Sequence, residues 1–199
     1  HVKPFVKGNK NDRNDAFAIT EAARRPDLKC VEPRTLIQTD LIQLHRVLDR
    51  MIRQRTALIN QLRGFLNEYG LIVAKGKEKL LATMPGLLED AENGLTPASR
   101  VLFQKLYEQW RQANEAINRL EKGLKRQANN DEAAQRLMKM KGVAEKISTA
   151  TIAHAGNGRG YKSGRHFSAN LGLVPKEHSS GGKQKLGGIT KRGNRYLRR

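Results

Sequence analysis

Residues 36–69 read LIQTDLIQLHRVLDRMIRQRTALINQLRGFLNEY, and apolar side chains recur along them at intervals of three and four. The members of this repeat are Leu41, Leu44, Leu48, Met51, Leu58, Leu62, Phe65 and Tyr69, with Arg55 as the one polar member. Such spacing is typical of the apolar face of a coiled-coil helix. At 1.5 Å per residue, the stretch predicts a helix about 50 Å long. Gly70 follows it and is a residue type that commonly ends a helix.

The same spacing returns in a second stretch, which begins near residue 97. Its members are Phe103, Leu106, Trp110, Ala113, Ile117, Leu120 and Leu124. Thr96 predicts the N-cap of this helix and Pro97 its first turn. The segment between the two stretches contains Gly76, Pro85, Gly86 and Gly94, and we interpret it as a looser connection.

We assign residues 35–130 to a coiled-coil helical region. Two helices that each carry one apolar face must bury those faces. They can pair with each other as an antiparallel hairpin, or with a second subunit, and an ordinary monomeric bundle is a further arrangement. We expect a homo-oligomer held together through this region.

The charge of the chain indicates a nucleic-acid partner. Lys and Arg number 38 against 19 for Asp and Glu, so the formal net charge of the 199 residues is +19. Each cation that meets a phosphate releases a condensed counterion, which favours DNA or RNA as the partner. A membrane partner is not expected, because no apolar run approaches the ~20 residues of a spanning helix.

The expected compartment is the bacterial cytoplasm, in association with the nucleoid. The start, HVKPFVKGNK, lacks the apolar core of a signal peptide. Cys30 is the single cysteine, so no internal disulfide forms, which suits a reducing compartment. Because the first residue is His, we expect the chain to start inside a longer protein.

Residues 131–199 are assigned to a small basic C-terminal domain. Within it, residues 156–199 contain 10 of the 18 glycines and 11 Lys or Arg against one acid, Glu177. Gly187 and Gly188 predict a tight hairpin between short strands. Clustered cations on one surface bind phosphates. The candidate nucleic-acid-binding residues are Lys183, Lys185, Lys191, Arg192, Arg195 and Arg198.

Asp12 and Asp15 form the first candidate catalytic motif. Carboxylates three residues apart lie on one face of a helix and can share a divalent metal. Magnesium held in this way neutralises charge on a phosphate that is being transferred. The structural alternative is that Asp12 is an N-cap and that Asp15 interacts with the helix dipole in the first turn.

The second candidate motif is Glu177-His178-Ser179-Ser180-Gly181-Gly182-Lys183. A serine next to two glycines lies on backbone that can approach a phosphate closely. Serine needs a base, a metal or a positive field before it acts as a nucleophile, and the nearby cations could provide that field. His178 is a candidate base. The structural alternative is a flexible Gly/Ser loop that follows a nucleic-acid backbone.

Taken together, these segments resemble the DEDD-type insertion-sequence transposases of the IS110 and IS1111 group. The resemblance covers nearly the whole chain in order. It includes VKPFVKGNKNDRNDA (2–16), LHRVLDRMIRQRTALINQLRGFLNEYG (44–70), NGLTPASR (93–100) and GRHFSANLGLVPKEHSSGGKQKLGGITKRGNRYLRR (164–199). The last block is the most specific, because its Gly, Ser, Lys and Arg spacing fits no common fold-level pattern.

The resemblance implies a RuvC-like domain with an RNase H fold, whose Asp-Glu-Asp-Asp tetrad binds magnesium. Asp12 and Asp15 match the last two acids, and the first two would lie upstream of His1. Residues 1–34 are then the C-terminal remnant of that domain. The resemblance further implies a C-terminal serine that forms a covalent phosphoserine link to DNA, with Ser180 as the best match and Ser179 as the alternative. Family members are guided by a structured RNA.

The expected fold is therefore mainly α, with a remnant of an RNase H-like α/β domain, a long coiled-coil helical hairpin and a small basic C-terminal transposase domain. The expected function is that of an RNA-guided, Mg²⁺-dependent DNA transposase, although this fragment should be inactive alone because half of the tetrad is missing. One alternative is a non-catalytic nucleic-acid-binding module that dimerises through the coiled coil. Another is a nuclease that uses the carboxylates without a serine intermediate.

Overall fold

The computed structural model describes residues 2–9, 11–28 and 33–198, and the chain divides into two compact units, His1–Thr35 and Leu36–Arg199. The first unit contains a 3-10 helix, η1 (Lys3–Phe5), and helix α1 (Asp12–Ala23). No strand forms among its described residues, so its assignment to an RNase H-like domain stays a prediction. Cys30 lies outside the described residues.

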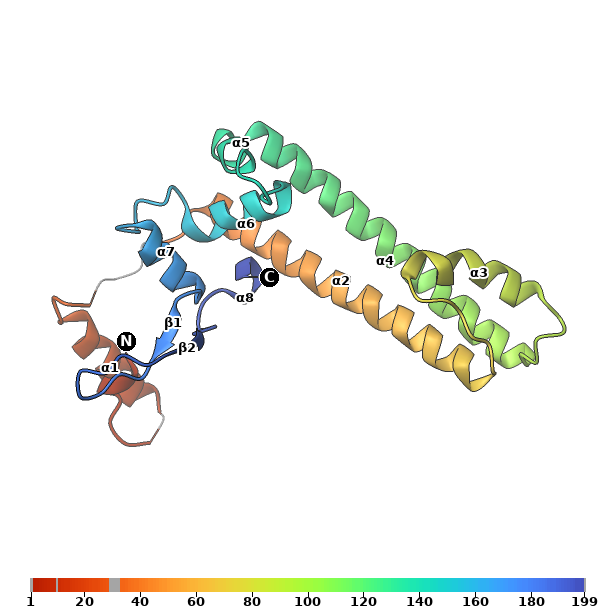
Figure 1. The fold of residues 1–199 in the computed structure, drawn as a ribbon, viewed down its shortest axis with the longest axis horizontal. Coiled ribbons are helices and arrows are strands. Elements are labelled where there is room, and N and C mark those ends of the chain that lie inside the picture. Colours follow the sequence, from red (N-terminus) through yellow and green to blue (C-terminus); the bar gives the residue numbers. More distant parts are fainter. Residues whose placement is uncertain (1, 10, 29–32, 199) are drawn as a thin grey trace. The chain divides into compact units, whose positions relative to one another are not determined.

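Two long antiparallel helices, α2 (Leu36–Glu68) and α4 (Pro97–Asn130), frame the second unit (Figure 1). Both predicted ends are confirmed. The Thr96 hydroxyl accepts a hydrogen bond from the Ser99 amide at 3.2 Å, and Pro97 is the first residue of α4. After α2, Gly70 has a φ of +73°, and this left-handed conformation ends the helix.

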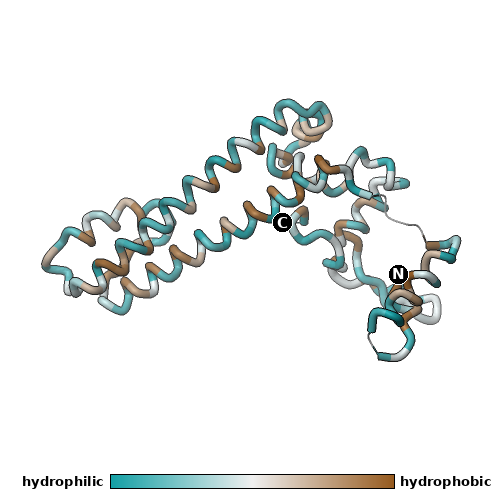
Figure 2. The backbone as a smooth tube through the Cα atoms, turned by 180° about the vertical axis from the view of Figure 1, so that it is seen from behind, coloured by the Kyte–Doolittle hydropathy of each residue, from teal (hydrophilic) through white to brown (hydrophobic). Residues whose placement is uncertain are grey.

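The predicted apolar face of α4 is confirmed. Its large members at seven-residue intervals are all buried: Phe103, Trp110, Ile117 and Leu124. They pack against α2, so the two faces cover each other within one chain. Figure 2 shows the matching recurrence of apolar segments along both helices. The helical hairpin is therefore present, while supercoiling of a coiled coil and pairing with a second subunit stay predictions.

The apolar face of α2 follows the predicted repeat as far as Leu62. Leu41, Leu48 and Leu62 are buried, but near the end Leu66 is buried while Phe65 and Tyr69 are partly exposed. An α-helix has 3.6 residues per turn, so a strict repeat of 3.5 drifts around a straight helix.

Arg55, the polar member of the repeat on α2, has a specific partner on the opposite helix. Its guanidinium donates a hydrogen bond to the Asn114 side-chain oxygen of α4 at 2.8 Å. This bond satisfies a charged group at the helix interface, where an unpaired one would cost free energy.

Helix α3 (Lys77–Glu89) forms where the sequence predicts a looser connection, so that prediction is wrong. The helix contains Pro85, which removes one backbone donor. Burial of Leu80 and Met84 against α2 and α4 compensates for this loss. The Arg100 guanidinium donates to the carbonyls of Leu87, Leu88 and Asp90, and so satisfies the C-terminal end of α3.

Two shorter helices, α5 (Glu132–Met138) and α6 (Glu145–Ala155), fold back onto the long pair. Helix α6 packs on both α2 and α4 through small side chains, which allow a close approach. These buried residues are Ser148, Thr149, Ala150 and Ala153.

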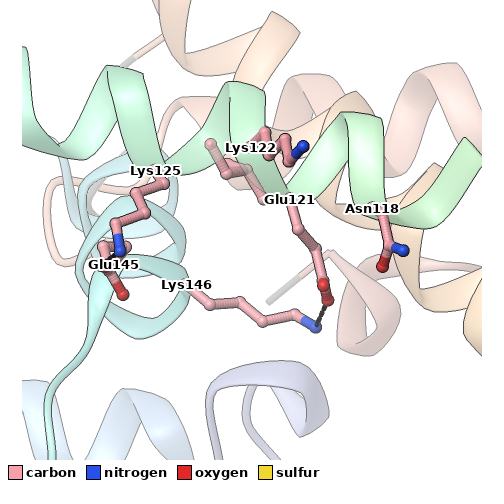
Figure 3. A pocket seen from close by; sticks show the side chains of 7 residues that line it. Asn118, Glu121, Lys122, Lys125, Glu145 and Lys146 are labelled. Atoms are coloured by element: carbon pink, nitrogen blue, oxygen red, sulfur yellow. Dashed lines mark hydrogen bonds and ion pairs between the residues drawn. The ribbon is translucent and has the colours of Figure 1, made fainter. Parts of the chain in front are cut away.

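A cavity of about 400 Å³ lies between α4 and α6 (Figure 3). Two ion pairs border it, one with its lysine on α6 and the other with its lysine on α4. Lys146 of α6 lies 3.5 Å from Glu121 of α4, and Lys125 of α4 lies 3.5 Å from Glu145 of α6. All four side chains are partly exposed, so the two ion pairs add little stability.

The C-terminal part consists of α7 (Gly164–Leu171), a two-stranded antiparallel sheet and α8 (Arg195–Arg198). The strands β1 (Pro175–Glu177) and β2 (Leu186–Ile189) pair Pro175 with Ile189 and Glu177 with Leu186. None of the described helices of the chain combines the length and the apolar character needed to cross a membrane.

The predicted hairpin is present, but its predicted turn is misplaced. Gly187 and Gly188 lie inside β2, where the register shift sets these two residues opposite the single residue Lys176. They therefore form a β-bulge. The turn lies instead at Gly181 and Gly182, because these two glycines carry the positive φ angles.

Candidate functional site

Asp12 and Asp15 both lie in the first turn of α1. The N-cap is Asn11, whose side-chain oxygen accepts a hydrogen bond from the Asn14 amide at 2.8 Å. The alternative prediction that Asp12 is the N-cap is therefore wrong. Asp12 is exposed and Asp15 half-buried, and neither forms an ion pair with another described residue.

Carboxylates such as those of Asp12 and Asp15 are the oxygen ligands that Mg²⁺ takes in proteins. Mg²⁺ is commonly held by one or two carboxylates, with water and phosphate oxygens in its remaining positions. Over residues 2–9, 11–28 and 33–198, no group of three or more acidic, His or Cys side chains is placed to hold a metal. Asp12 and Asp15 therefore fit the ion only as part of a larger set of ligands.

Ser180 lies at the first position of the hairpin turn. Its carbonyl accepts a hydrogen bond from the Lys183 amide at 3.1 Å, which closes a four-residue turn. The central residues Gly181 and Gly182 have φ angles of +58° and +74°, as a type I′ turn requires. A Cβ atom on either would have open space around it, so glycine serves the backbone conformation at these positions.

The two serines of the motif have different surroundings. Both are exposed. The Ser179 hydroxyl donates to Glu177 Oε1 at 2.6 Å and accepts from the Lys185 amide at 3.2 Å. The Ser180 hydroxyl forms no hydrogen bond to another described residue, and so faces solvent with its donor and acceptor free. His178 is also exposed, and its amide donates to the Lys185 carbonyl at 3.0 Å.

The six candidate cations differ in their accessibility. Those that are exposed are Lys183, Lys185, Lys191, Arg192 and Arg195. Arg198 is half-buried, and its guanidinium donates to the carbonyls of Leu171 and Gly193 at 3.0 and 3.3 Å. Arg198 therefore joins the end of α7 to the segment before α8. Lys191 has a φ of +57°, unusual for a residue with a side chain.

A buried histidine links the short helix α8 to α2 and α6. His45 of α2 is only 4% exposed and lies 3.0 Å from the Tyr196 hydroxyl and 3.1 Å from Thr149 Oγ1. Because the Thr149 hydroxyl donates to the Glu145 carbonyl, it accepts from Nε2 of His45. Nδ1 is then the acceptor for Tyr196.

Burial lowers the pKa of His45 from 6.5 to about 4, with a further contribution from the Lys146 ammonium. The ring is therefore neutral near pH 7, as the assigned hydrogen bonds require. His45 links α2, α6 and α8 through uncharged hydrogen bonds.

A second histidine ties α6 to the segment around the sheet. His154 Nε2 lies 2.7 Å from the Asn170 side-chain oxygen, and its Nδ1 lies 3.3 Å from the side-chain nitrogen Nδ2 of Asn194. Asn194 also accepts from the Tyr196 amide at the start of α8. The backbones of α7 and of the segment before α8 cross nearby, at Gly172 and Gly193. A Cβ on Gly193 would collide with the Asn170 carbonyl and the backbone of Leu171.

Family models match both ends of the chain. The model described as "Transposase IS116/IS110/IS902 family" matches residues 134–199, which include the hairpin and Ser180. A second model, described as "Transposase", matches residues 2–71, which include Asp12 and Asp15. The transposase for insertion sequence element IS1111A of Coxiella burnetii is 43% identical over 198 residues, or 100% of this chain.

Residues 2–71 and 134–199 are therefore transposase family domains, the second of the IS116/IS110/IS902 family.

Two further transposases are similar over nearly the same range. The transposase for insertion sequence element IS1328 of Yersinia enterocolitica is 41% identical over 200 residues, or 100% of this chain. A probable family 20 transposase of Pseudomonas aeruginosa is 39% identical over 198 residues, or 99% of this chain. The chain spans 54%, 58% and 59% of the Coxiella, Yersinia and Pseudomonas proteins, respectively.

Sequence reasoning missed two features of the site. The first is the bond between Glu177 and Ser179, although a carboxylate two residues from a serine could have indicated it. The second is the pair of histidines, His45 and His154, that hold the C-terminal segments. Nothing local in the sequence indicates that role, because their partners lie up to 151 residues away.

Proposed function

We propose that this chain is part of a DNA transposase that cleaves and joins DNA strands for an insertion sequence through the Ser180 hydroxyl. The observation that carries the proposal is the exposed Ser180, with a free hydroxyl, on a glycine turn inside the region matched by the transposase family model. The names of the relatives support the same function, since each is described as a transposase.

In the proposed reaction, the Ser180 oxygen attacks a phosphorus atom of the DNA backbone. A phosphoserine ester forms, the bond from phosphorus to the leaving deoxyribose oxygen breaks, and that oxygen takes up a proton. The serine proton passes to a base or to solvent. Because the ester conserves the energy of the broken bond, the hydroxyl of a second DNA strand can displace the serine and complete the transfer.

The cations around the turn support this chemistry through electrostatics. Lys183 and Lys185 lie within five residues of Ser180 and are exposed, and Lys191, Arg192 and Arg195 follow on the same C-terminal segment. Positive charge that is fixed before the reaction stabilises the additional negative charge of a pentacoordinate phosphate.

Asp12 and Asp15 are the proposed metal ligands of this chain. When bound, Mg²⁺ would neutralise charge on the transferring phosphate. Asp12 is exposed and Asp15 half-buried, and neither forms an ion pair with another described residue, which supports this role. Guidance by a structured RNA and assembly of several subunits through the helical hairpin belong to the same proposal, supported by the family resemblance and the net charge of +19.

Replacement of Ser180 by Ala tests the proposal in the full-length transposase. We expect strand exchange to fall by more than about 1000-fold, as when a nucleophilic serine is removed. The dissociation constant for DNA should change little, because the cations remain. Ser168→Ala is the matched control, since Ser168 lies on α7 away from the turn. Recombination by Ser180→Ala at the control rate would refute the role of Ser180, and Mg²⁺-dependent cleavage that survives would favour a nuclease.

A further inference from the structure

The charge of Glu177 is unexpected at its position. It is the one acid among residues 156–199, which contain 11 Lys or Arg. A carboxylate three residues from Ser180 repels the phosphate that the surrounding cations attract. Its presence therefore lowers nucleic-acid affinity, and the hydrogen bonds of the hairpin indicate what it provides in return.

Glu177 and Ser179 form a chain of hydrogen bonds across the neck of the hairpin, which we define as residues 177–179 and the facing Lys185. The Ser179 hydroxyl donates to Glu177 Oε1 at 2.6 Å, a short distance that is typical of a bond to a charged acceptor. The Ser179 Oγ also accepts from the Lys185 amide on the opposite side of the hairpin, at 3.2 Å. The Glu177 carboxylate thus fixes the rotation of the Ser179 hydroxyl, so that a lone pair of the Ser179 oxygen points at the Lys185 amide.

The tip of the hairpin has few other interactions that could order it. Every residue from Pro175 to Ile189 is exposed, so no apolar side chain at the tip is buried. The turn itself is made by two glycines, which have the largest backbone freedom in the unfolded or mobile state. Besides backbone bonds, the described contacts across the neck are those of Ser179. Ser180 directly follows Ser179 in this chain.

We propose that Glu177 is a positioning residue for Ser180: through the Ser179 hydroxyl and the Lys185 amide, it fixes the hairpin neck that presents the nucleophile. The inference rests on the proposed function of Ser180. It also explains why adjacent serines differ, because Ser179 is engaged as a structural donor and acceptor while Ser180 is free. A nucleophile held in one orientation reacts faster than one on a mobile loop.

Four variants of the full-length transposase test the inference. Glu177→Ala and Ser179→Ala each break the chain of hydrogen bonds, whereas Glu177→Gln retains an oxygen that accepts from Ser179. We expect the single-turnover rate of covalent adduct formation with DNA to fall roughly tenfold in both alanine variants, and no more than roughly threefold in Glu177→Gln. The double variant Glu177→Ala/Ser179→Ala should be no slower than either single variant, because all three lose the same interaction.

Nucleic-acid affinity separates this role from a simple charge effect. Glu177→Gln and Glu177→Ala remove the same negative charge. The two variants should therefore bind DNA with equal affinity, and slightly more tightly than the wild type. A difference between them in rate but not in affinity then reports the hydrogen bond. Equal rates in these two variants, or independent effects of Glu177→Ala and Ser179→Ala that multiply in the double variant, would overturn the inference.

Amide hydrogen exchange of Lys185 tests the chain of hydrogen bonds from Glu177 through Ser179 without reference to the nucleophile. Exchange should accelerate in Glu177→Ala and Ser179→Ala and remain near the wild-type rate in Glu177→Gln. Unchanged exchange in both alanine variants would show that these hydrogen bonds do not protect the Lys185 amide. Adduct formation that persists in Ser180→Ala would instead refute the proposed function, while the exchange rates would still decide the role of Glu177.

Discussion

At the scale of single residues, His45 has the clearest consequence for stability. It is buried between Thr149 and Tyr196, and its pKa is about 4 in the folded chain against 6.5 for an exposed histidine. Lys146 is the charged group that faces it from α6 and opposes protonation. Because the unfolded chain binds a proton more readily, the stabilising effect is complete above pH 6.5 and is lost as the pH falls toward 4.

We expect the free energy of unfolding to decrease by about 2 kcal/mol between pH 7 and pH 5 through this residue alone. Urea titrations at both pH values measure the decrease. His45→Asn removes the titrating group and should be less stable at pH 7, but with a smaller change between the two pH values. An identical pH dependence in the wild type and in this variant would contradict the buried, neutral ring.

Some roles of single residues could be predicted from the sequence, and others could not. The motif around Ser180 could be singled out because its Gly and Ser spacing is local. The role of Arg198 could not, because its partners Leu171 and Gly193 become neighbours only after folding. The Asn11 cap was missed because Asn11 and Asp12 are both good N-caps, and only the backbone conformation of Asn11 decides between them.

At the scale of elements, the crossing of α7 with the segment before α8 depends on two glycines. A Cβ on Gly193 would collide with backbone atoms of Asn170 and Leu171, which cannot move as a flexible side chain can. Gly172 is equally constrained, since its Cβ would lie 2.6 Å from the Gly193 nitrogen and its φ is +73°. The backbones of these elements therefore touch directly.

We expect Gly193→Ala to destabilise the C-terminal part by several kcal/mol, in the range of overpacked or strained sites. Thermal unfolding and proteolysis of the segment after α6 measure this effect. Gly123→Ala is the control, because Gly123 lies in α4 with open space at its Cβ. That change should stabilise the chain by about 0.5–1 kcal/mol through helix propensity. Equal stability of Gly193→Ala and the wild type would contradict the close crossing.

The long helices and the existence of the hairpin could be predicted, whereas helix α3 and the position of the hairpin turn could not. In α4 the apolar repeat extends over three heptads, from Phe103 to Leu124, so helical period and burial agree. Helix α3 was missed because Pro85 and the flanking glycines indicate a loop, whereas burial of Leu80 and Met84 decides the outcome. The hairpin turn was misplaced because two Gly-Gly pairs occur six residues apart and either is compatible with a turn.

At the scale of the whole molecule, the net charge of +19 should make nucleic-acid binding strongly dependent on salt. In the proposed function, the exposed cations contribute through phosphate contacts. Lys185→Ala should therefore reduce the slope of log affinity against log salt by about one. Arg198→Ala should leave the slope nearly unchanged and instead lower the melting temperature, because its guanidinium holds two carbonyls.

Filter binding of a DNA duplex at several salt concentrations, together with thermal unfolding, checks both variants. A reduced slope in Arg198→Ala at unchanged stability would show that this side chain is free to bind phosphate. The contrast between the two residues matters because the sequence alone assigns them the same role.

The central claim is that Ser180 becomes covalently linked to DNA, and the most direct measurement is to trap and map that adduct. The full-length transposase is incubated with DNA of its element and quenched, and the linked peptide is fragmented in a mass spectrometer. Trypsin would release the segment EHSSGGK, residues 177–183, in which fragmentation distinguishes the two serines. We expect a nucleotide phosphate on Ser180. An adduct on Ser179, on a residue elsewhere, or strand transfer without any protein–DNA adduct would contradict it.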